Sequence, residues 1–390
     1  MKRKILVAVM LAAIALTAFS QTVTYNFPEV QPKDARTMGM GGAFHVFSQG
    51  YSSFFGNPAG YAGMSSLTLL DLSTWAYLAP TTTNVSRIQS LFSGASLTNI
   101  IGYASDWVTG NNGLGAGTSI GLGWVGKKGI SFGVNLVTDE VVAGSSLLTA
   151  RLSSATQANG VLGLAYPFKL GPLSLKIGAD GRIFYRMQSN PVAGWGITSV
   201  ITDFSNPGNI SASSFAFIGG YGFAADAGVI FGIGPVMFGF SARDLGLEFK
   251  VGSFTAQDLA NGDFGALISG GSVSAMLTPA YAAGVGIRLF ENGLFEPSVY
   301  AEVDDPLTLV QSTDFVTDAL KSLHAGAQLR LLRFITARAG LNKGWYSIGA
   351  GIDLSFIEFD AAMFTEETGM YPGEKGRSGI SIQAAIRFGR

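Results

Sequence analysis

A run of strict two-residue alternation near the C-terminus limits what this chain can fold into. From Trp345 to Phe356 the sequence reads WYSIGAGIDLSF, so the even-numbered residues are apolar and the odd-numbered ones after Trp345 are small or polar. Successive side chains on a β-strand point to opposite faces, which predicts a strand with one apolar and one polar face. The same pattern recurs from about residue 116 to the C-terminus, and its polar face carries charges that a dry core would not accept.

The composition favours one large membrane barrel over several soluble domains. Apolar residues make up 47% of the 390 residues and mean hydropathy is +0.34, yet charged residues make up only 13%, about half the usual share. After the N-terminus no apolar stretch reaches the roughly 20 residues of a spanning helix. The 53 glycines and 28 phenylalanines fit glycine-rich strands with aromatic edges.

We therefore predict an all-β fold, a transmembrane antiparallel β-barrel of about 14 strands over residues 65–390. Bacterial single-chain barrels have an even number of strands. A soluble β-sandwich also alternates, but its outer face is charged, whereas here one face of nearly every strand is apolar. The predicted strands are 65–79, 116–126, 129–138, 158–168, 173–187, 216–232, 236–250, 279–290, 294–304, 322–332, 334–342, 344–356, 357–366 and 378–388.

Short and long connections alternate along this predicted barrel. Outer-membrane barrels have short periplasmic turns and longer external loops, so both ends of the mature chain are predicted on the periplasmic side. The segment 84–108 has a helical rhythm, which predicts either an external-loop helix over the barrel mouth or a packed loop. Tight-turn signals occur at 127–129, 170–172, 233–235 and 291–293, and the long segments are 80–115, 139–157, 188–215, 251–278, 305–321 and 367–377.

The first 20 residues have the features of a secretory signal peptide. Lys2, Arg3 and Lys4 form a basic region, an apolar stretch to Leu16 follows, and Ala18-Phe19-Ser20 is a small-x-small cleavage site. An N-terminal membrane anchor is the alternative, but the apolar stretch is short for a spanning helix. These residues predict export and, with the barrel, a location in the cell outer membrane.

Several functional classes have no support in the sequence. A net charge of −1 gives no electrostatic basis for nucleic-acid binding. The absence of cysteine excludes thiolate metal sites and cysteine nucleophiles. No H-E-x-x-H, G-x-S-x-G or phosphate-binding loop motif occurs. We predict that the chain is not an enzyme and needs no cofactor or metal.

Ionisable residues of both signs recur on the predicted inner faces of the strands. One interpretation is a network of paired charges that fills and stiffens the lumen. The other is that a basic subset grips an anionic head group, because arginine suits bidentate carboxylate binding. The candidate ligand residues in the lumen are Arg182, Arg186, Arg243, Arg330 and Arg338.

Residues 33–64 are not strand-like, and residues 21–64 are predicted to form a hatch, or plug, ahead of the barrel. They contain a glycine-rich element at Gly39–Ala43 and an aromatic-Asn-Pro-Ala-Gly element at Phe54–Gly60. Glycine permits close backbone packing, Asn can bond its own backbone, and Pro fixes a turn. The predicted hatch residues are Gly39, Gly41, Gly42, Asn57, Pro58 and Ala59.

This pair of elements resembles the N-terminal hatch of the FadL-like family of outer-membrane long-chain fatty-acid transporters, and the C-terminal third resembles the family's last strands. PorV-type barrels, which serve protein secretion, are related and share the same opening. The resemblance implies passive uptake of hydrophobic molecules such as long-chain fatty acids, which pass the hatch and leave through the barrel wall. The expected partners are membrane lipids and hydrophobic small molecules. The alternatives are a structural or secretion-associated barrel with a protein partner at its external loops, and an open diffusion porin.

Overall fold

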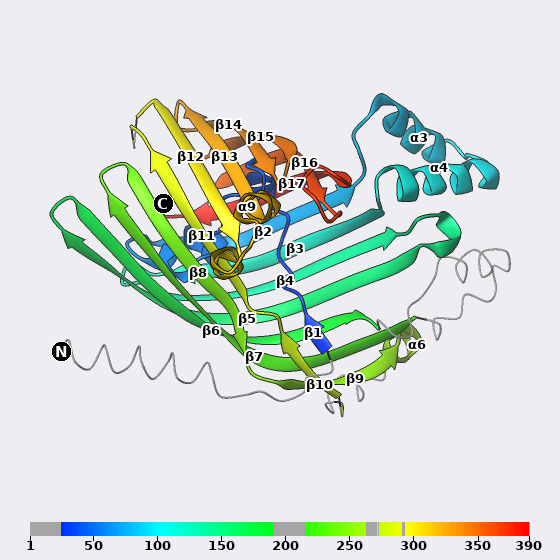
Figure 1. Cartoon of the computed structure of the whole chain (residues 1–390), viewed down its shortest axis with the longest axis horizontal. Helices are drawn as coiled ribbons and strands as arrows, with labels where there is room; N and C mark the ends of the chain where they lie inside the picture. Colours follow the sequence, from blue (N-terminus) through cyan, green and yellow to red (C-terminus); the bar gives the residue numbers. More distant parts are fainter. Residues whose placement is uncertain (1–24, 191–214, 263–270, 272, 291–292, 390) are drawn as a thin grey trace.

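Fourteen antiparallel strands form a closed barrel (Figure 1). The structure is a computed structural model that describes residues 25–190, 215–262, 271, 273–290 and 293–389. Each barrel strand pairs with the next one along the chain, and β17 pairs with β2 to close the barrel, which confirms all fourteen predicted strands. The strands are β2 (Ser66–Tyr77), β3 (Leu114–Val125), β4 (Ile130–Ala143), β5 (Arg151–Leu170), β6 (Leu173–Ser189), β7 (Ala216–Ile233), β8 (Val236–Gly246), β11 (Ala280–Arg288), β12 (Phe295–Asp304), β13 (Leu323–Leu331), β14 (Ile335–Asn342), β15 (Trp345–Leu354), β16 (Ile357–Glu367) and β17 (Gly376–Phe388).

The alternation near the C-terminus has the predicted orientation. On β15, Ile348 and Ile352 are 58% and 48% exposed, whereas Ser347 and Gly351 are buried. The outward face is therefore apolar and the inward face is small and polar, as a barrel in lipid requires. Register follows from this pattern, because a shift by one residue would turn every apolar side chain into the lumen.

Exposed aromatic side chains gather where the short turns lie, which we call the turn end of the barrel; the opposite rim is the loop end. Three ring pairs lie there: Trp124–Phe132, Tyr166–Phe168 and Phe356–Phe388. Aromatic girdles of this kind mark the membrane–water interface of transmembrane barrels. The outer surface is thus that of a membrane-spanning barrel.

The loop end carries the helices and a small extra sheet. Strand β9 (Phe249–Thr255) pairs with the start of β7 beyond the end of β8, β10 (Val273–Leu277) pairs with β9, and β1 (Tyr25–Phe27) pairs with β10 in parallel. Figure 1 shows α3 and α4 beyond the strand ends, so the helical rhythm at 84–108 is confirmed as two helices. In the described ranges, no helix is long and apolar enough to cross a membrane. The helices at this end are α3 (Thr82–Phe92), α4 (Leu97–Gly110), η3 (Leu147–Thr149), α6 (Ala256–Ala260), α8 (Pro306–Val310) and α9 (Phe315–Ser322).

Three details differ from the sequence predictions. The predicted long segment 139–157 shrinks to 144–150, because β4 and β5 continue their pairing beyond the predicted ends. The predicted strand 236–250 stops at Gly246, and β9 follows as a separate strand. The N-terminal strand β1 lies at the loop end and not at the predicted periplasmic end, since the chain runs down the barrel before β2 begins at the turn end. The predicted signal peptide 1–20 lies outside the described residues.

Residues 28–64, which we call the inner segment, lie within the barrel. Its helix α2 (Ala35–Gly39) packs against β14 to β17, its 3-10 helix η1 (Gly50–Phe54) against β2 and β3, and η2 (Pro58–Tyr61) against β5 to β7. These strands lie on different sides of the wall, so the segment reaches across the lumen. Most of its side chains from Ala35 to Ala62 are buried.

A charge placed on the outward face of β15 tests this orientation. Ile348→Arg puts a guanidinium into the lipid near mid-strand and is expected to lower the free energy of unfolding in lipid vesicles by about 2–4 kcal/mol. Tyr346→Arg, at the strand's loop-end edge, is the matched control and should cost about 0–1 kcal/mol. Equal, negligible costs for both variants would contradict the assigned faces.

Candidate functional site

The glycine-rich element of the inner segment lies flat against the inner faces of β14 and β15. A Cβ added to Gly39 would lie 3.1 Å from the Cα of Gly349, and Ser347 Oγ donates to the Gly39 carbonyl at 3.4 Å. Gly41 has φ +71° and approaches the backbone of Leu341 so closely that a Cβ would lie 2.5 Å from its nitrogen. Only glycine both adopts this positive φ readily and lacks the Cβ that would clash with Leu341.

A histidine of the wall holds the next turn of the inner segment. His324 Nδ1 lies 2.8 Å from the Gly41 carbonyl oxygen, and its Nε2 lies 2.9 Å from Asp304 Oδ2. Lys343 Nζ contacts the same carboxylate oxygen at 2.9 Å. Gly42, at φ +84°, leaves room for the imidazole, because a Cβ there would lie 2.6 Å from Nδ1. The wall therefore binds this turn through polar contacts as well as through close packing.

The Asn-Pro-Ala element anchors the other half of the inner segment. The fully buried Asn57 donates from Nδ2 to the carbonyls of Val46 at 2.9 Å, Phe240 at 3.2 Å and Val229 at 3.4 Å. Its Oδ1 accepts from the backbone N–H of Ala59 at 2.9 Å, which caps η2. One amide thus ties the segment to itself and to two wall strands, with Pro58 and Ala59 buried beside it.

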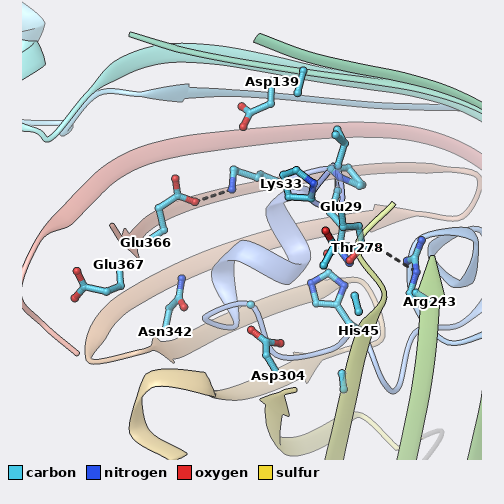
Figure 2. A pocket seen from close by; sticks show the side chains of 18 of the residues that line it. Glu29, Lys33, His45, Asp139, Arg243, Thr278, Asp304, Asn342, Glu366 and Glu367 are labelled. Atoms are coloured by element: carbon cyan, nitrogen blue, oxygen red, sulfur yellow. Dashed lines mark hydrogen bonds and ion pairs between the residues drawn. The ribbon is translucent and has the colours of Figure 1, made fainter. Parts of the chain in front are cut away.

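A chamber of about 920 Å³ lies between the inner segment and the loop end (Figure 2). It is lined by residues 28–33 on one side and by the loop-end edges of the strands on the other. Its surface is strongly charged, with acidic and basic side chains in equal number. The acidic ones are Glu29, Asp139, Asp304, Asp305, Glu366 and Glu367; the basic ones are Lys33, Arg151, Arg186, Arg243, Lys343 and Arg377.

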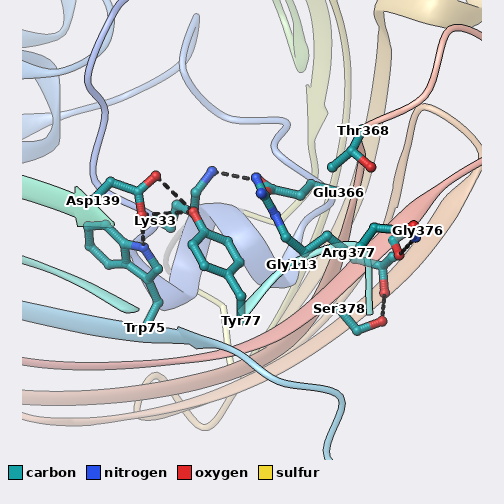
Figure 3. Close-up of polar contacts among 12 residues, drawn as sticks. Lys33, Trp75, Tyr77, Gly113, Asp139, Glu366, Thr368, Gly376, Arg377 and Ser378 are labelled. Atoms are coloured by element: carbon teal, nitrogen blue, oxygen red, sulfur yellow. Dashed lines mark hydrogen bonds and ion pairs between the residues drawn. The ribbon is translucent and has the colours of Figure 1, made fainter. Parts of the chain in front are cut away.

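Ion pairs connect the inner segment to the wall of this loop-end chamber. Lys33 Nζ lies 2.6 Å from Glu366, which also accepts from Arg377 Nε at 2.8 Å (Figure 3). Asp139 accepts from Trp75 Nε1 at 2.8 Å and from the Tyr77 hydroxyl at 2.9 Å. Opposite charges are thus matched within the chamber wall.

Burial shifts the pKa of several titratable groups in the inner segment, among them Glu29 and His45. Burial raises the pKa of Glu29 to about 7 despite the opposing charge of Arg243. Arg243 Nε lies 3.1 Å from Glu29 Oε1, within ion-pair distance but without the alignment of a hydrogen bond. Burial lowers the pKa of His45 to about 4, so this imidazole is neutral at physiological pH. The charge of Glu29 therefore changes near neutral pH, at the rim of the loop-end chamber.

A second chamber of about 450 Å³ lies on the other side of the inner segment, at the turn end. Arg36, Gln49, Gly50, Tyr51 and Met64 line it from the inner segment. The wall contributes Ser66, Arg288, Glu296, Ser298, Gln328, Arg330, Glu358 and Arg387. The inner segment thus separates two polar chambers within one barrel.

The five predicted ligand arginines do not form one site. Arg182 pairs with Asp226 at 3.4 Å and with Asp244, and Arg243 pairs with Glu29 and, at 3.8 Å, with Asp226. Arg186 is fully buried and donates to the amide oxygens of Gln157 at 3.3 Å and Gln188 at 3.1 Å.

Arg338 pairs with Asp360 at 2.5 Å, and Arg330 lies 3.7 Å from Glu296. Arg182, Arg186 and Arg243 lie toward the loop end of the barrel. Arg330 and Arg338 lie toward the turn end. The contacts agree with a network of paired charges; binding of an anionic head group stays a prediction.

Sequence reasoning missed the charged residues of the inner segment itself. Glu29, Lys33 and Arg36 lie outside any strand pattern, and the partner of Lys33 is 333 residues away in the chain. No local signal connects such residues. Among the residues that the structure describes, no group of acidic or histidine side chains could hold a metal ion.

A comparison with solved structures aligns this chain with two toluene transporters and a FadL homologue. The Pseudomonas putida toluene transporter TodX aligns at 12% identity over 94% of this chain and 99% of its own, with a TM-score of 0.46. The Ralstonia pickettii toluene transporter TbuX gives 12% identity over 93% and 99%, with a TM-score of 0.43. A Pseudomonas aeruginosa FadL homologue gives 12% identity over 92% and 99%, also with a TM-score of 0.43. At these values the likeness says nothing about what this chain binds.

No protein-family model matches the chain. A comparison with curated protein sequences also gives no match.

Removal of the Asn57 amide should loosen the inner segment. Asn57→Ala leaves three wall and segment carbonyls and the Ala59 N–H without their partner, and is expected to lower the free energy of unfolding in detergent micelles by about 1–3 kcal/mol. Asn99→Ala, on the exposed face of α4, is the matched control and should stay within about 0.5 kcal/mol of the parent. Equal stability of the two variants would show that Asn57 is not an anchor.

Proposed function

We propose that this chain is an outer-membrane channel for the passive uptake of small hydrophobic molecules, and that the inner segment is the plug that closes its lumen. The apolar, aromatic-edged outer surface supports a location in the membrane, and the signal-peptide features of residues 1–20 support export. The observation that carries the proposal is the inner segment itself, which packs against the wall on several sides and separates two chambers. A barrel filled in this way blocks free diffusion of water and ions.

The part of the plug that opens is residues 28–33. Residues 39–61 are interlocked with the wall through backbone contacts and the buried Asn57. Residues 28–33 instead line the loop-end chamber and contact the wall through ion pairs, such as Lys33 with Glu366 and Glu29 with Arg243, and through the buried side chain of Val30. The chamber beside this stretch gives it room to move while the remainder stays in place.

The polarity of the chambers restricts the path of a hydrophobic molecule. An alkyl chain that moved straight along the lumen would have to pass the charged side chains on both sides of the loop-end chamber, which disfavours that route. A route from the loops to a lateral exit through the barrel wall, as the family resemblance implies, avoids the turn-end chamber. Large apolar side chains exposed on the loops can collect such molecules; among them are Phe92, Val310, Phe315, Val316 and Met370.

Long-chain fatty acids are the proposed ligands, and uptake of radiolabelled oleate tests this. Expression of the chain in a host that lacks its own transporter should raise oleate uptake several-fold. Phe315→Asp combined with Val316→Asp should reduce this gain, because charge on α9 weakens the capture of an alkyl chain. Thr313→Asp, an exposed polar position just before the helix, is the matched control. Unchanged uptake with a folded barrel in the membrane would rule out fatty acids as the ligands.

A protein partner at the external loops is the second candidate function. The same exposed apolar side chains on α8, α9 and the β16–β17 loop support it, because large apolar patches also mark protein interfaces. Isolation of the protein from native outer membrane separates the two candidates: a stoichiometric protein partner favours the secretion-associated barrel, and bound lipid favours transport. An open diffusion porin is disfavoured, because the inner segment fills the space through which ions would flow.

A further inference from the structure

Two arginines from different parts of the chain meet at one corner of the turn-end chamber. Arg36 projects from α2 of the inner segment, and Arg330 from β13 of the wall. Both line the chamber of about 450 Å³ and also a recess of about 50 Å³ that shares Gln328 and Glu358 with it. The corner therefore brings two guanidinium groups to the same enclosed, polar space.

Arg36 has no carboxylate partner within 4 Å among the residues that the structure describes. Its guanidinium stacks on the ring of Phe44, 3.9 Å from the centroid, and its buried Nε has no hydrogen-bond partner. Burial and the nearby charge of Arg338 lower the pKa of Arg36 to about 9, which still leaves it charged at pH 7. Asp360 is near enough to favour the charged form of Arg36 but lies beyond ion-pair distance, so the guanidinium keeps donors that an anion in the chamber can use.

Arg330 is held only loosely by its acidic neighbours. It lies 3.7 Å from Glu296 and 3.9 Å from Asp353, whereas Arg338 lies 2.5 Å from Asp360 and Arg387 lies 2.5 Å from Glu358. Its side chain is also 37% exposed, the largest exposure among these arginines. Glu358 and Asp360 thus pair closely with other arginines, whereas the guanidinium of Arg330 lines the chamber with two longer ion pairs.

Gln328 adds a neutral donor between them. Its Oε1 accepts from Arg338 Nε at 3.1 Å, which orients the side-chain amide and leaves its NH₂ group to donate. Four arginines and two glutamates line the chamber, and Arg338, Asp353 and Asp360 join Arg36, Arg330 and Glu358 around the recess. Both glutamates face an arginine, Glu296 with Arg330 and Glu358 with Arg387.

We propose that this corner binds a small oxyanion of phosphate or sulfate size, held by Arg36, Arg330 and Gln328. Guanidinium groups bind phosphate oxygens in pairs of parallel hydrogen bonds, and an amide NH₂ adds a further donor. The volume accommodates such an ion with part of its hydration shell. The bound anion connects α2 to β13, and it therefore holds the inner segment against the wall. This site does not depend on which molecule the barrel transports.

Equilibrium dialysis of the full-length protein in detergent against radiolabelled inorganic phosphate tests the site. The parent protein should bind one phosphate per barrel saturably, and unlabelled sulfate should compete with it. Arg36→Gln should weaken phosphate binding at least 10-fold, because it removes the unpaired charge. Arg151→Gln, an exposed arginine at the loop-end chamber, is the matched control and should bind as the parent does.

A second variant and a second readout keep the test decisive. Arg330→Gln removes the half-exposed guanidinium of the corner and should also weaken binding at least 10-fold, so it decides the matter if Arg36→Gln does not fold. Phosphate should raise the melting temperature of the parent protein but not that of a folded Arg36→Gln variant. Absence of saturable phosphate binding by the parent, or equal binding by the parent and both arginine variants, would overturn the proposal.

Discussion

The lumen of a fourteen-stranded barrel is too wide for its own wall side chains to fill, and the structure depends on how that space is occupied. Here the N-terminal stretch of the same chain occupies it. The wall makes this possible with small residues at the points of contact, such as Gly349 against Gly39 and Gly228 against Asn57. The inner segment in turn is almost wholly buried, so neither part is complete without the other.

The inner segment also determines the surroundings of the ionisable side chains in the lumen. A barrel wall in lipid has only its inner face for polar groups, and the inner segment covers much of that face. The ionisable residues are consequently partly enclosed, and most of those with described contacts are paired, such as Arg182 with Asp226 and Arg338 with Asp360. The remaining space divides into two polar chambers. Residues 28–33 and Arg36 thus line different chambers, on opposite sides of the inner segment.

Much of the fold was predictable because each strand carries its own period-two signal. The Trp345–Phe356 alternation gave the correct inward and outward faces of β15, and the same rule located all fourteen strands. The extensions of β4 and β5 were not predicted, because the ends of these strands carry charged and polar residues, such as Asp139 and Arg151, that are typical of loops. The site was less predictable. Turn chemistry drew attention to Gly41 and Asn57, but pairs such as Lys33–Glu366 join residues far apart in sequence and have no local signature.

An inner segment seated in the lumen requires that α2 lies against the inner face of β16, and one disulfide tests this directly. The chain has no cysteine, so the double variant Gly39→Cys, Ala362→Cys introduces a single possible bond. A Cβ on Gly39 would lie 3.5 Å from the Cβ of Ala362, within the range of a disulfide. The pair should oxidise in intact membranes, whereas Gly39→Cys with Ala361→Cys, whose second site faces lipid, should not. Free thiols at 39 and 362 in a folded barrel under oxidising conditions would contradict an inner segment seated in the lumen.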